Sequence, residues 1–267
     1  MRCDLNRLVR GICVLVLVVS AFGAANAQDF QGIYAGAYGG GQQGNSDAHT
    51  FTVFSPVGYF ATSSIPAIAT AGNQHLTPSG SSGGGTFGFN LQHRWFVYGV
   101  ETDFGSMSTS KTAVTGPVQY PCCPPTLTNP NNFTVTQTVS TDWLFTGRGR
   151  LGVAAGHLLL YGTGGLAATN LNYKALFTDT FAAAHENAGL EQKRKGWIAG
   201  GGAEFRLSHH WSIKGEFLHA DFGQEQISST NLTTTFGTTT VLFPQNPFTH
   251  NADLTAHIYR GGLNYRF

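Results

Sequence analysis

The chain has 267 residues and a formal net charge of +1, and charged residues make up only 11% of it, far below the usual quarter. So neutral a chain lacks the basic surface with which proteins bind nucleic acid, and that class of partner is excluded. Glycine (35) and phenylalanine (20) are abundant. Few charges, many aromatic residues and no apolar 20-residue run after residue 27 are typical of a chain that crosses a membrane with strands.

The first 27 residues have the three parts of a secretory signal peptide. Arg2, Arg7 and Arg10 precede an apolar run over 11–22, and Ala-Asn-Ala at 25–27 is a cleavage site. The run is too short to span a bilayer, which disfavours the alternative of an uncleaved anchor. We therefore predict a cleaved signal peptide over 1–27 and one domain over 28–267. Cleavage shifts the net charge to −1, because it removes three arginines and one aspartate.

The mature chain contains eight segments with the two-residue alternation of a strand that has one apolar and one polar face. In 96–104, for example, Phe96, Tyr98 and Val100 alternate with Gly99 and Glu101. The eight segments, in chain order, are 30–40, 86–92, 96–104, 142–153, 158–168, 196–205, 211–222 and 258–267.

The connections between these segments alternate in length. Tight turns are expected at His93-Arg94, at 155–157 and at 208–210, whereas the other connections have about 25–45 residues by our boundaries. A short helix is predicted in the third of these, over 181–195. Four long loops disfavour a compact soluble domain such as a secreted β-sandwich. They favour an all-β, eight-stranded antiparallel up-and-down transmembrane β-barrel with short periplasmic turns and four long extracellular loops.

The chain ends in the middle of a strand pattern, on Phe267. Tyr259, Leu263, Tyr265 and Phe267 fall on one face of this last strand, and the opposite face carries Arg260. The apolar set is predicted to face lipid, with Phe267 in the aromatic girdle at the periplasmic interface.

Seven segments in order resemble the porin-type outer-membrane surface-antigen family of Gram-negative bacteria: "GIYAGAYGG", "VYGVETDF", "FTGRGRLGV", "LLYGTGGLA", "GWIAGGGAEF", "SIKGEFLHADFG" and "GGLNYRF". The resemblance implies an eight-stranded barrel with OmpA-like topology, integral to the cell outer membrane, with its loops facing outside. It also implies outer-membrane lipid as surroundings, and a role in envelope integrity and as a surface antigen. Barrels of this class use an aromatic end as their assembly signal, so it implies that Tyr259, Leu263, Tyr265 and Phe267 are read by the barrel insertion machinery.

Two alternative functions accompany the resemblance. Some members of the family are described as passive small-solute pores, and others as binders of haem or of a host ligand through the extracellular loops. The loops of this chain match no ligand pattern that can be transferred to individual residues, so no cofactor is predicted.

The polar faces of the strands should converge in the barrel lumen. An eight-stranded barrel is just wide enough for its side chains to fill, and buried charges must pair because an unpaired one is costly. A salt-bridged plug is therefore favoured over a charge-lined conduit. Glu204 and Lys214 are expected to lie opposite one another about the turn at His209, and Arg260 is expected to pair with Glu216. The predicted luminal charges are Glu101, Asp103, Arg148, Arg150, Glu204, Lys214, Glu216 and Arg260.

Cys122 and Cys123 are the cysteines of the mature chain, and they are adjacent. Neighbouring Cα atoms lie about 3.8 Å apart, which is less than the usual span of a disulfide. In an oxidising compartment they either form a vicinal disulfide or pair with another chain. The pattern leaves both open.

The histidines show no metal-binding spacing. His49, His75, His185 and His250 fall in predicted loops and are interpreted as solvated. His219 and His257 have similar heights on neighbouring strands and are interpreted as girdle residues. We predict no metal site.

Catalytic motifs are also missing from the sequence. Two G-x-G-x-x-G matches, at 39–44 and 147–152, do not open a helix, so nucleotide binding is not expected. No G-x-S-x-G elbow is present. Asp221, His250 and Asp253, near the extracellular strand ends, are the residues with which an enzymatic function would be tested. We predict that the chain is not an enzyme.

Overall fold

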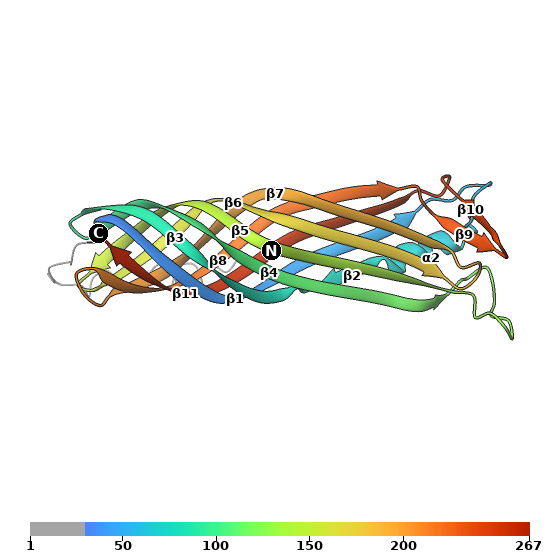
Figure 1. Cartoon of the computed structure of the whole chain (residues 1–267), viewed down its shortest axis with the longest axis horizontal. Coiled ribbons are helices and arrows are strands. Elements are labelled where there is room, and N and C mark those ends of the chain that lie inside the picture. The colour runs from blue at the N-terminus through green and yellow to red at the C-terminus, as the bar shows by residue number, and fades with distance from the viewer. Residues whose placement is uncertain (1–29) are drawn as a thin grey trace, which may run out of the picture.

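The computed structural model describes residues 30–267, so the predicted signal peptide lies outside the described residues. Eight long strands form one antiparallel sheet that closes on itself, and Figure 1 shows it as an elongated cylinder. In chain order the wall strands are β1 (Gly32–Thr52), β3 (Ser79–His93), β4 (Phe96–Gln119), β5 (Asn132–Ala155), β6 (Leu158–Asp179), β7 (His185–Arg206), β8 (Trp211–Ser229) and β11 (Phe248–Arg266).

The ring closes between the first and last strands. β1 pairs with β3 on one side and with β11 on the other, where Tyr34 lies opposite Arg266. β8 pairs with both β11 and β7. Every wall strand thus has two neighbours, which removes the open edge that lipid does not tolerate. The predicted eight-stranded up-and-down barrel is confirmed.

Smaller elements gather at one end of the cylinder. Helix α2 (Ser64–Ala71) and strand β2 (Asn73–Leu76) lie between β1 and β3, and strands β9 (Thr233–Phe236) and β10 (Thr239–Leu242) form a hairpin between β8 and β11. We call this the loop end, and we call the opposite end, with the tight connections, the turn end (Figure 1). Within residues 30–267, no helix is both long enough and apolar enough to cross a bilayer.

The tight turns were predicted correctly, but the strand lengths were not. The strands have 15 to 24 residues, compared with the roughly ten expected of a transmembrane strand. The connections at the loop end shrink to residues 53–78, 120–131, 180–184 and 230–247. The helix predicted over 181–195 is wrong, because β7 begins at His185. Beyond the membrane-like segments the outer face of each strand turns polar and the inner face mixes polar with apolar residues, so the strand pattern is weaker and resembles a loop.

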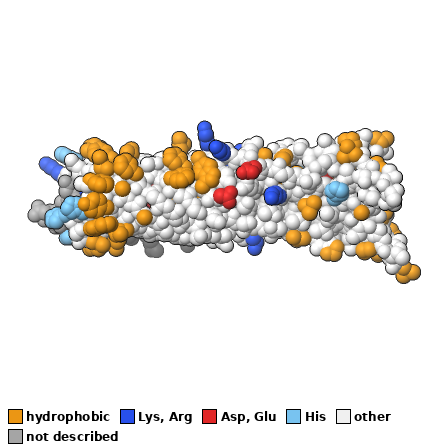
Figure 2. Space-filling model, viewed as in Figure 1, with side chains coloured by type: hydrophobic (Ala, Val, Ile, Leu, Met, Phe, Trp, Pro, Cys, Tyr) orange, Lys and Arg blue, Asp and Glu red, His pale blue; other side chains and the backbone are white. Residues whose placement is uncertain are grey.

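An apolar band surrounds the turn half of the barrel. Phe89, Phe104 and Tyr259, with most other large hydrophobic side chains of this half, are exposed on the outer wall. Figure 2 shows hydrophobic side chains gathered over this half, then basic and acidic side chains near the middle, and only scattered hydrophobic side chains beyond. This order places the bilayer around the turn half of the barrel.

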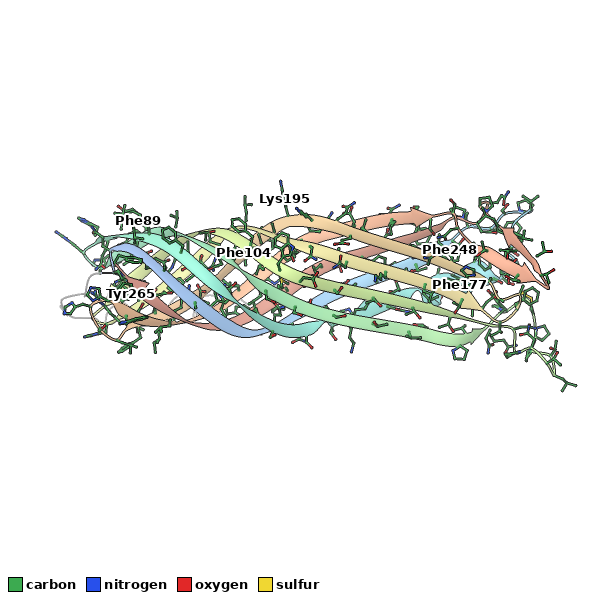
Figure 3. All side chains as sticks on the ribbon, viewed as in Figure 1. Phe89, Phe104, Phe177, Lys195, Phe248 and Tyr265 are labelled. Carbon is green, nitrogen blue, oxygen red and sulfur yellow. A yellow bond between two sulfur atoms is a disulfide. The ribbon has the colours of Figure 1, made fainter. Side chains whose placement is uncertain are left out.

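The interior is filled in layers from the turn end to the loop end. Phe30, Val97 and Leu159 form a first apolar layer, followed by the charged residues described below. A second apolar layer then includes Met107, Leu144, Leu171, Leu218, Phe222, Leu254 and Ile258. An aromatic cap closes the loop end and consists of Phe60, Tyr120, Phe133, Phe177 and Phe248; Phe177 and Phe248 are labelled in Figure 3.

Candidate functional site

The eight predicted luminal charges lie in one buried layer, which we call the luminal network. They come from β4, β5, β7, β8 and β11, because alternate residues of each strand face the lumen. All eight side chains are buried. The set contains equal numbers of acidic and basic residues, namely Glu101, Asp103, Glu204, Glu216, Arg148, Arg150, Lys214 and Arg260.

Glu101 lies at the centre of the network. Its carboxylate forms ion pairs with Arg148, with Arg150 at 3.3 Å and with Lys214 at 2.9 Å. The hydroxyl of Tyr34 donates a further hydrogen bond to Glu101 Oε2 at 2.8 Å. One carboxylate thus joins strands β1, β4, β5 and β8.

Arg260 connects the last strand to two other acids. Its Nε donates to Glu216 Oε2 at 2.7 Å, and its Nη2 donates to Asp103 Oδ2 at 2.8 Å. Arg148 approaches the same Asp103 oxygen at 2.7 Å. The expected contact between Arg260 and Glu216 is therefore present in the structure.

Glu204 and Lys214 are register partners across the β7–β8 turn, as expected. Their ion pairs nevertheless go elsewhere. Lys214 lies 3.5 Å from Glu216 and also contacts Glu101, whereas Glu204 contacts Arg150 at 2.8 Å. In a narrow lumen the long side chains reach across the barrel, so register alone does not determine the pairing.

Sequence reasoning missed the tyrosines and the arginine that complete this layer. The Tyr161 hydroxyl donates to Glu216 at 2.7 Å, and the Arg150 guanidinium lies 3.9 Å from the centre of the Tyr161 ring. Arg260 lies 4.2 Å from the ring centre of Tyr38. Arg266 lies 3.5 Å from Glu204. The signal was that Tyr34 and Tyr38 share a face with Gly36, opposite the apolar face of their strand.

A second polar layer lies nearer the loop end, around His250 and Glu186. His250 Nδ1 lies 2.8 Å from Thr50 Oγ1, and its Nε2 lies 3.3 Å from Glu186 Oε1. Thr50 also donates to Gln137, as does Tyr173. The interpretation of His250 as a solvated loop histidine is wrong, because its side chain is buried inside the barrel. The error arose because β11 begins at Phe248, before the predicted start at residue 258, so His250 lies in the strand and not in a loop.

The three residues considered for catalysis are not brought together. His250 faces the interior. Asp221 accepts a hydrogen bond from the backbone N–H of Gly223, and Asp253 accepts one from the backbone N–H of Asp47 at 2.6 Å. Each of the two carboxylates thus has a structural partner of its own.

At the aromatic cap, the Asp179 carboxylate accepts hydrogen bonds from two tyrosine hydroxyls. Tyr59 donates to Asp179 Oδ2 at 2.6 Å, and Tyr120 donates to the same oxygen at 2.9 Å. Burial raises the pKa of Tyr59 and Tyr120 above the ordinary tyrosine value, and the nearby Asp179 carboxylate raises both further. These hydroxyls therefore remain donors well into the alkaline range.

The two adjacent cysteines form a disulfide with one another beside this cap. Tyr59, Tyr120 and Phe181 line a small pocket together with Cys122 and Cys123. The disulfide thus lies beside Tyr120, whose hydrogen bond to Asp179 connects the 120–131 segment to β6.

The residues of the closing strand face outward as the alternation indicates. Tyr259, Leu263 and Phe267 are exposed on the outer wall, and the Tyr265 ring packs against Phe267 with 5.3 Å between ring centres. Tyr265 lies at the turn end in Figure 3.

Comparison with known proteins agrees with this architecture. A family model described as "Outer membrane protein beta-barrel domain" matches residues 12–267. The chain belongs to this outer-membrane β-barrel family. It is therefore an integral protein of the cell outer membrane, with the tight turns on the periplasmic side and the loop end outside.

The chain is also similar to a curated protein and, at low sequence identity, to solved structures. The chain is 29% identical over 205 residues to the 31 kDa outer-membrane immunogenic protein of Brucella melitensis, covering 74% of this chain and 70% of that protein. The structure of OprG from Pseudomonas aeruginosa matches with a TM-score of 0.42 and 12% identity, over 89% of this chain and 96% of OprG. The Escherichia coli outer membrane protease OmpT matches with a TM-score of 0.44 and 8% identity, over 92% and 100%.

Proposed function

We propose that this outer-membrane protein has a structural role: it strengthens the envelope and displays a rigid surface structure, and it neither conducts solutes nor catalyses a reaction. The observation that carries the proposal is the filled interior. Buried side chains follow one another from Phe30 at the periplasmic end, through the luminal network and the second apolar layer, to the aromatic cap.

The luminal network supports a plug more than a conduit. Its four acids and four bases form direct ion pairs with one another, so the charged side chains are bound to each other across the lumen and do not line an open path. The adjoining layer presents the apolar side chains of Leu144, Leu218 and Ile258 to a permeating solute. A polar solute would have to cross both layers.

The extracellular half supports a display role. The strands continue past the apolar band as a barrel and carry α2 and the β9–β10 hairpin at their tip (Figure 1). A relative with 29% identity is named as an outer-membrane immunogenic protein, which supports a role as a surface antigen for this chain too.

A deletion strain tests the structural role. We expect the strain to become more sensitive to detergent, while its uptake of small hydrophilic solutes stays unchanged. Plasmid-borne wild-type protein should restore resistance. Normal detergent resistance together with slowed solute uptake would contradict the proposal and favour a pore.

We propose that residues 1–27 direct export and that the closing strand is the assembly signal for the barrel insertion machinery. The outward-facing Tyr259, Leu263 and Phe267 support this, because they present an apolar stripe at the end of the chain. Deleting Phe267 should lower the amount of inserted barrel several-fold, as judged by heat-shifted mobility of outer-membrane fractions, while the barrel refolded in detergent keeps its stability. Normal insertion of this variant would refute the proposal that the closing strand is the assembly signal.

A further inference from the structure

Two histidines face each other on the outer wall of the barrel. His219 of β8 and His257 of β11 are register partners, and both lie on the outward side of their strands with the exposed Phe217 and Tyr259. Their side chains are partly buried, and their Nδ1 atoms lie 3.4 Å apart. Neither histidine takes part in the luminal network or the cap.

This separation fits a shared metal ion better than a direct hydrogen bond. A hydrogen bond with an N–H donor usually spans about 2.7–3.2 Å between heavy atoms. Two imidazole nitrogens bound to one tetrahedral Zn²⁺ at about 2.0–2.1 Å each would lie roughly 3.3–3.4 Å apart. The two Nδ1 atoms therefore already have the separation that a shared tetrahedral ion requires.

Neighbouring aromatic rings hold this arrangement. The ring of His257 stacks on Phe217 at an interplanar angle of 13°, with 5.8 Å between ring centres. The ring of His219 packs against Trp197, with 5.2 Å between centres. Because packing fixes both rings, little side-chain freedom would be lost when an ion binds.

The location leaves the remaining coordination positions open. Phe217 and Tyr259 belong to the apolar band, and Asp221, two residues beyond His219, is a half-buried acid on the same outward face of β8. Among residues 30–267, no group of three His, Cys, Asp or Glu side chains is placed to hold a metal ion. An ion held here would complete its shell with water or with the oxygen of a phosphate or carboxylate from outside the protein.

We propose that His219 and His257 form a two-histidine surface site for a late first-row divalent ion, with Zn²⁺ as the best geometric fit. Imidazole nitrogens suit Zn²⁺ and Cu²⁺, and the spacing favours tetrahedral over square-planar coordination. The site joins β8 to β11 at the height where the β7–β8 ladder ends, at the register pair Trp197 and Asp221. A bound ion would cross-link the wall at this point.

The test uses the whole mature chain, refolded in detergent without a histidine tag and freed of metal. Equilibrium dialysis with Zn²⁺ near neutral pH should give one tightest-bound ion per chain. His219→Gln and His257→Gln should each weaken this binding at least about tenfold. Substituting residues that only hydrogen-bond to metal ligands already weakens affinity by about 10–100-fold. Lowering the pH should release the ion, because only neutral imidazole binds metal.

Matched controls decide the outcome. The double variant His209→Gln/His210→Gln removes two exposed histidines from the periplasmic turn and should bind Zn²⁺ as the wild type does. Cu²⁺ in place of Zn²⁺, and Zn²⁺ with added inorganic phosphate, show which ion fits best and whether phosphate completes the shell. Unchanged binding in His219→Gln/His257→Gln would overturn the proposal.

X-ray absorption of the Zn²⁺-loaded wild type tests the site without any variant. We expect two imidazole nitrogens and additional oxygens around the ion. A shell made of oxygens alone would overturn the proposal, even where a histidine variant fails to refold.

Discussion

Glu101 contacts side chains from β1, β5 and β8, so a single carboxylate balances several cations in the luminal network. Removing one partner from a buried ion-pair network leaves charge without compensation, which is usually far more harmful than replacing the whole network. The stability of the periplasmic half should therefore depend on this residue more than on any surface charge.

Glu101→Gln should lower the free energy of unfolding by about 3–5 kcal/mol, because Arg148, Arg150 and Lys214 would keep an unbalanced positive charge. Urea unfolding of the refolded barrel, followed by heat-shifted mobility, measures the change. Glu191→Gln, on an exposed side chain, is the control and should change stability by less than about 0.5 kcal/mol. Equal stability of both variants would contradict the central position of Glu101.

Gly88 makes room for the ring of Tyr34, its register partner on β1. A Cβ atom at Gly88 would lie 2.4 Å from Tyr34 Cζ, whereas one at the outward Gly147 would have no atom within 4 Å. Gly88→Ala should therefore destabilise the barrel by about 1–3 kcal/mol through overpacking, and Gly147→Ala should be nearly neutral. The same unfolding assay compares the two, and equal effects would show that the tyrosine can move aside.

For individual residues, the sequence predicts the face of the strand on which a side chain lies better than it predicts the contacts of that side chain. Two-residue alternation is enough to place Glu101, Arg148 and Arg260 on the luminal face, because charges cannot face lipid. The same alternation places Tyr34 and Tyr38 on the polar face, but tyrosine is also common in the outer girdle, so their luminal contacts were missed. The close approach of His219 and His257 depends on strand register, which the alternation leaves undetermined.

The strands are longer than their apolar patterns because two environments act on each of them. In the periplasmic half lipid selects one apolar face, and this half was predicted nearly strand by strand. In the extracellular half water covers the outer face, so segments such as 185–195 of β7 lose the contrast between faces. Helix α2 was missed for a related reason: eight residues in a long polar connection give little periodic signal.

The aromatic cap, together with the connections that Tyr59 and Tyr120 attach to it, should open more readily in strong alkali. Below the ordinary tyrosine pKa of about 10, Tyr59 and Tyr120 are protonated in both the closed and the opened cap, and pH has no effect through them. Above it, the opened cap loses these protons and the closed cap keeps them, because burial and Asp179 raise both pKa values. The opened form then binds fewer protons, so the stability of the closed cap falls as the pH rises.

Protease cleavage within residues 120–131, measured from pH 8 to pH 11, tests this prediction. Cleavage of the wild type should accelerate above about pH 10. In the Tyr59→Phe/Tyr120→Phe variant the rate should be higher at pH 8, because Asp179 loses two donors, and should rise less with pH. An equally steep rise in the variant would show that other groups control the cap.

For the whole molecule, composition, alternation and the alternating connection lengths are sufficient to predict an eight-stranded outer-membrane barrel, since few other folds accept such strands. The height of the barrel above the membrane, and the complete filling of its interior, follow from side-chain packing that no single segment reveals. The proposed function depends on the filled interior, because the same barrel wall around an open lumen would form a pore.

Planar-bilayer recording of the refolded wild-type chain tests this account most directly. Because side chains fill the lumen from Phe30 to the aromatic cap, the conductance should stay at that of the bare bilayer after insertion, which heat-shifted mobility of the same sample verifies. Reproducible stepwise openings of uniform size in the wild type would contradict a closed barrel.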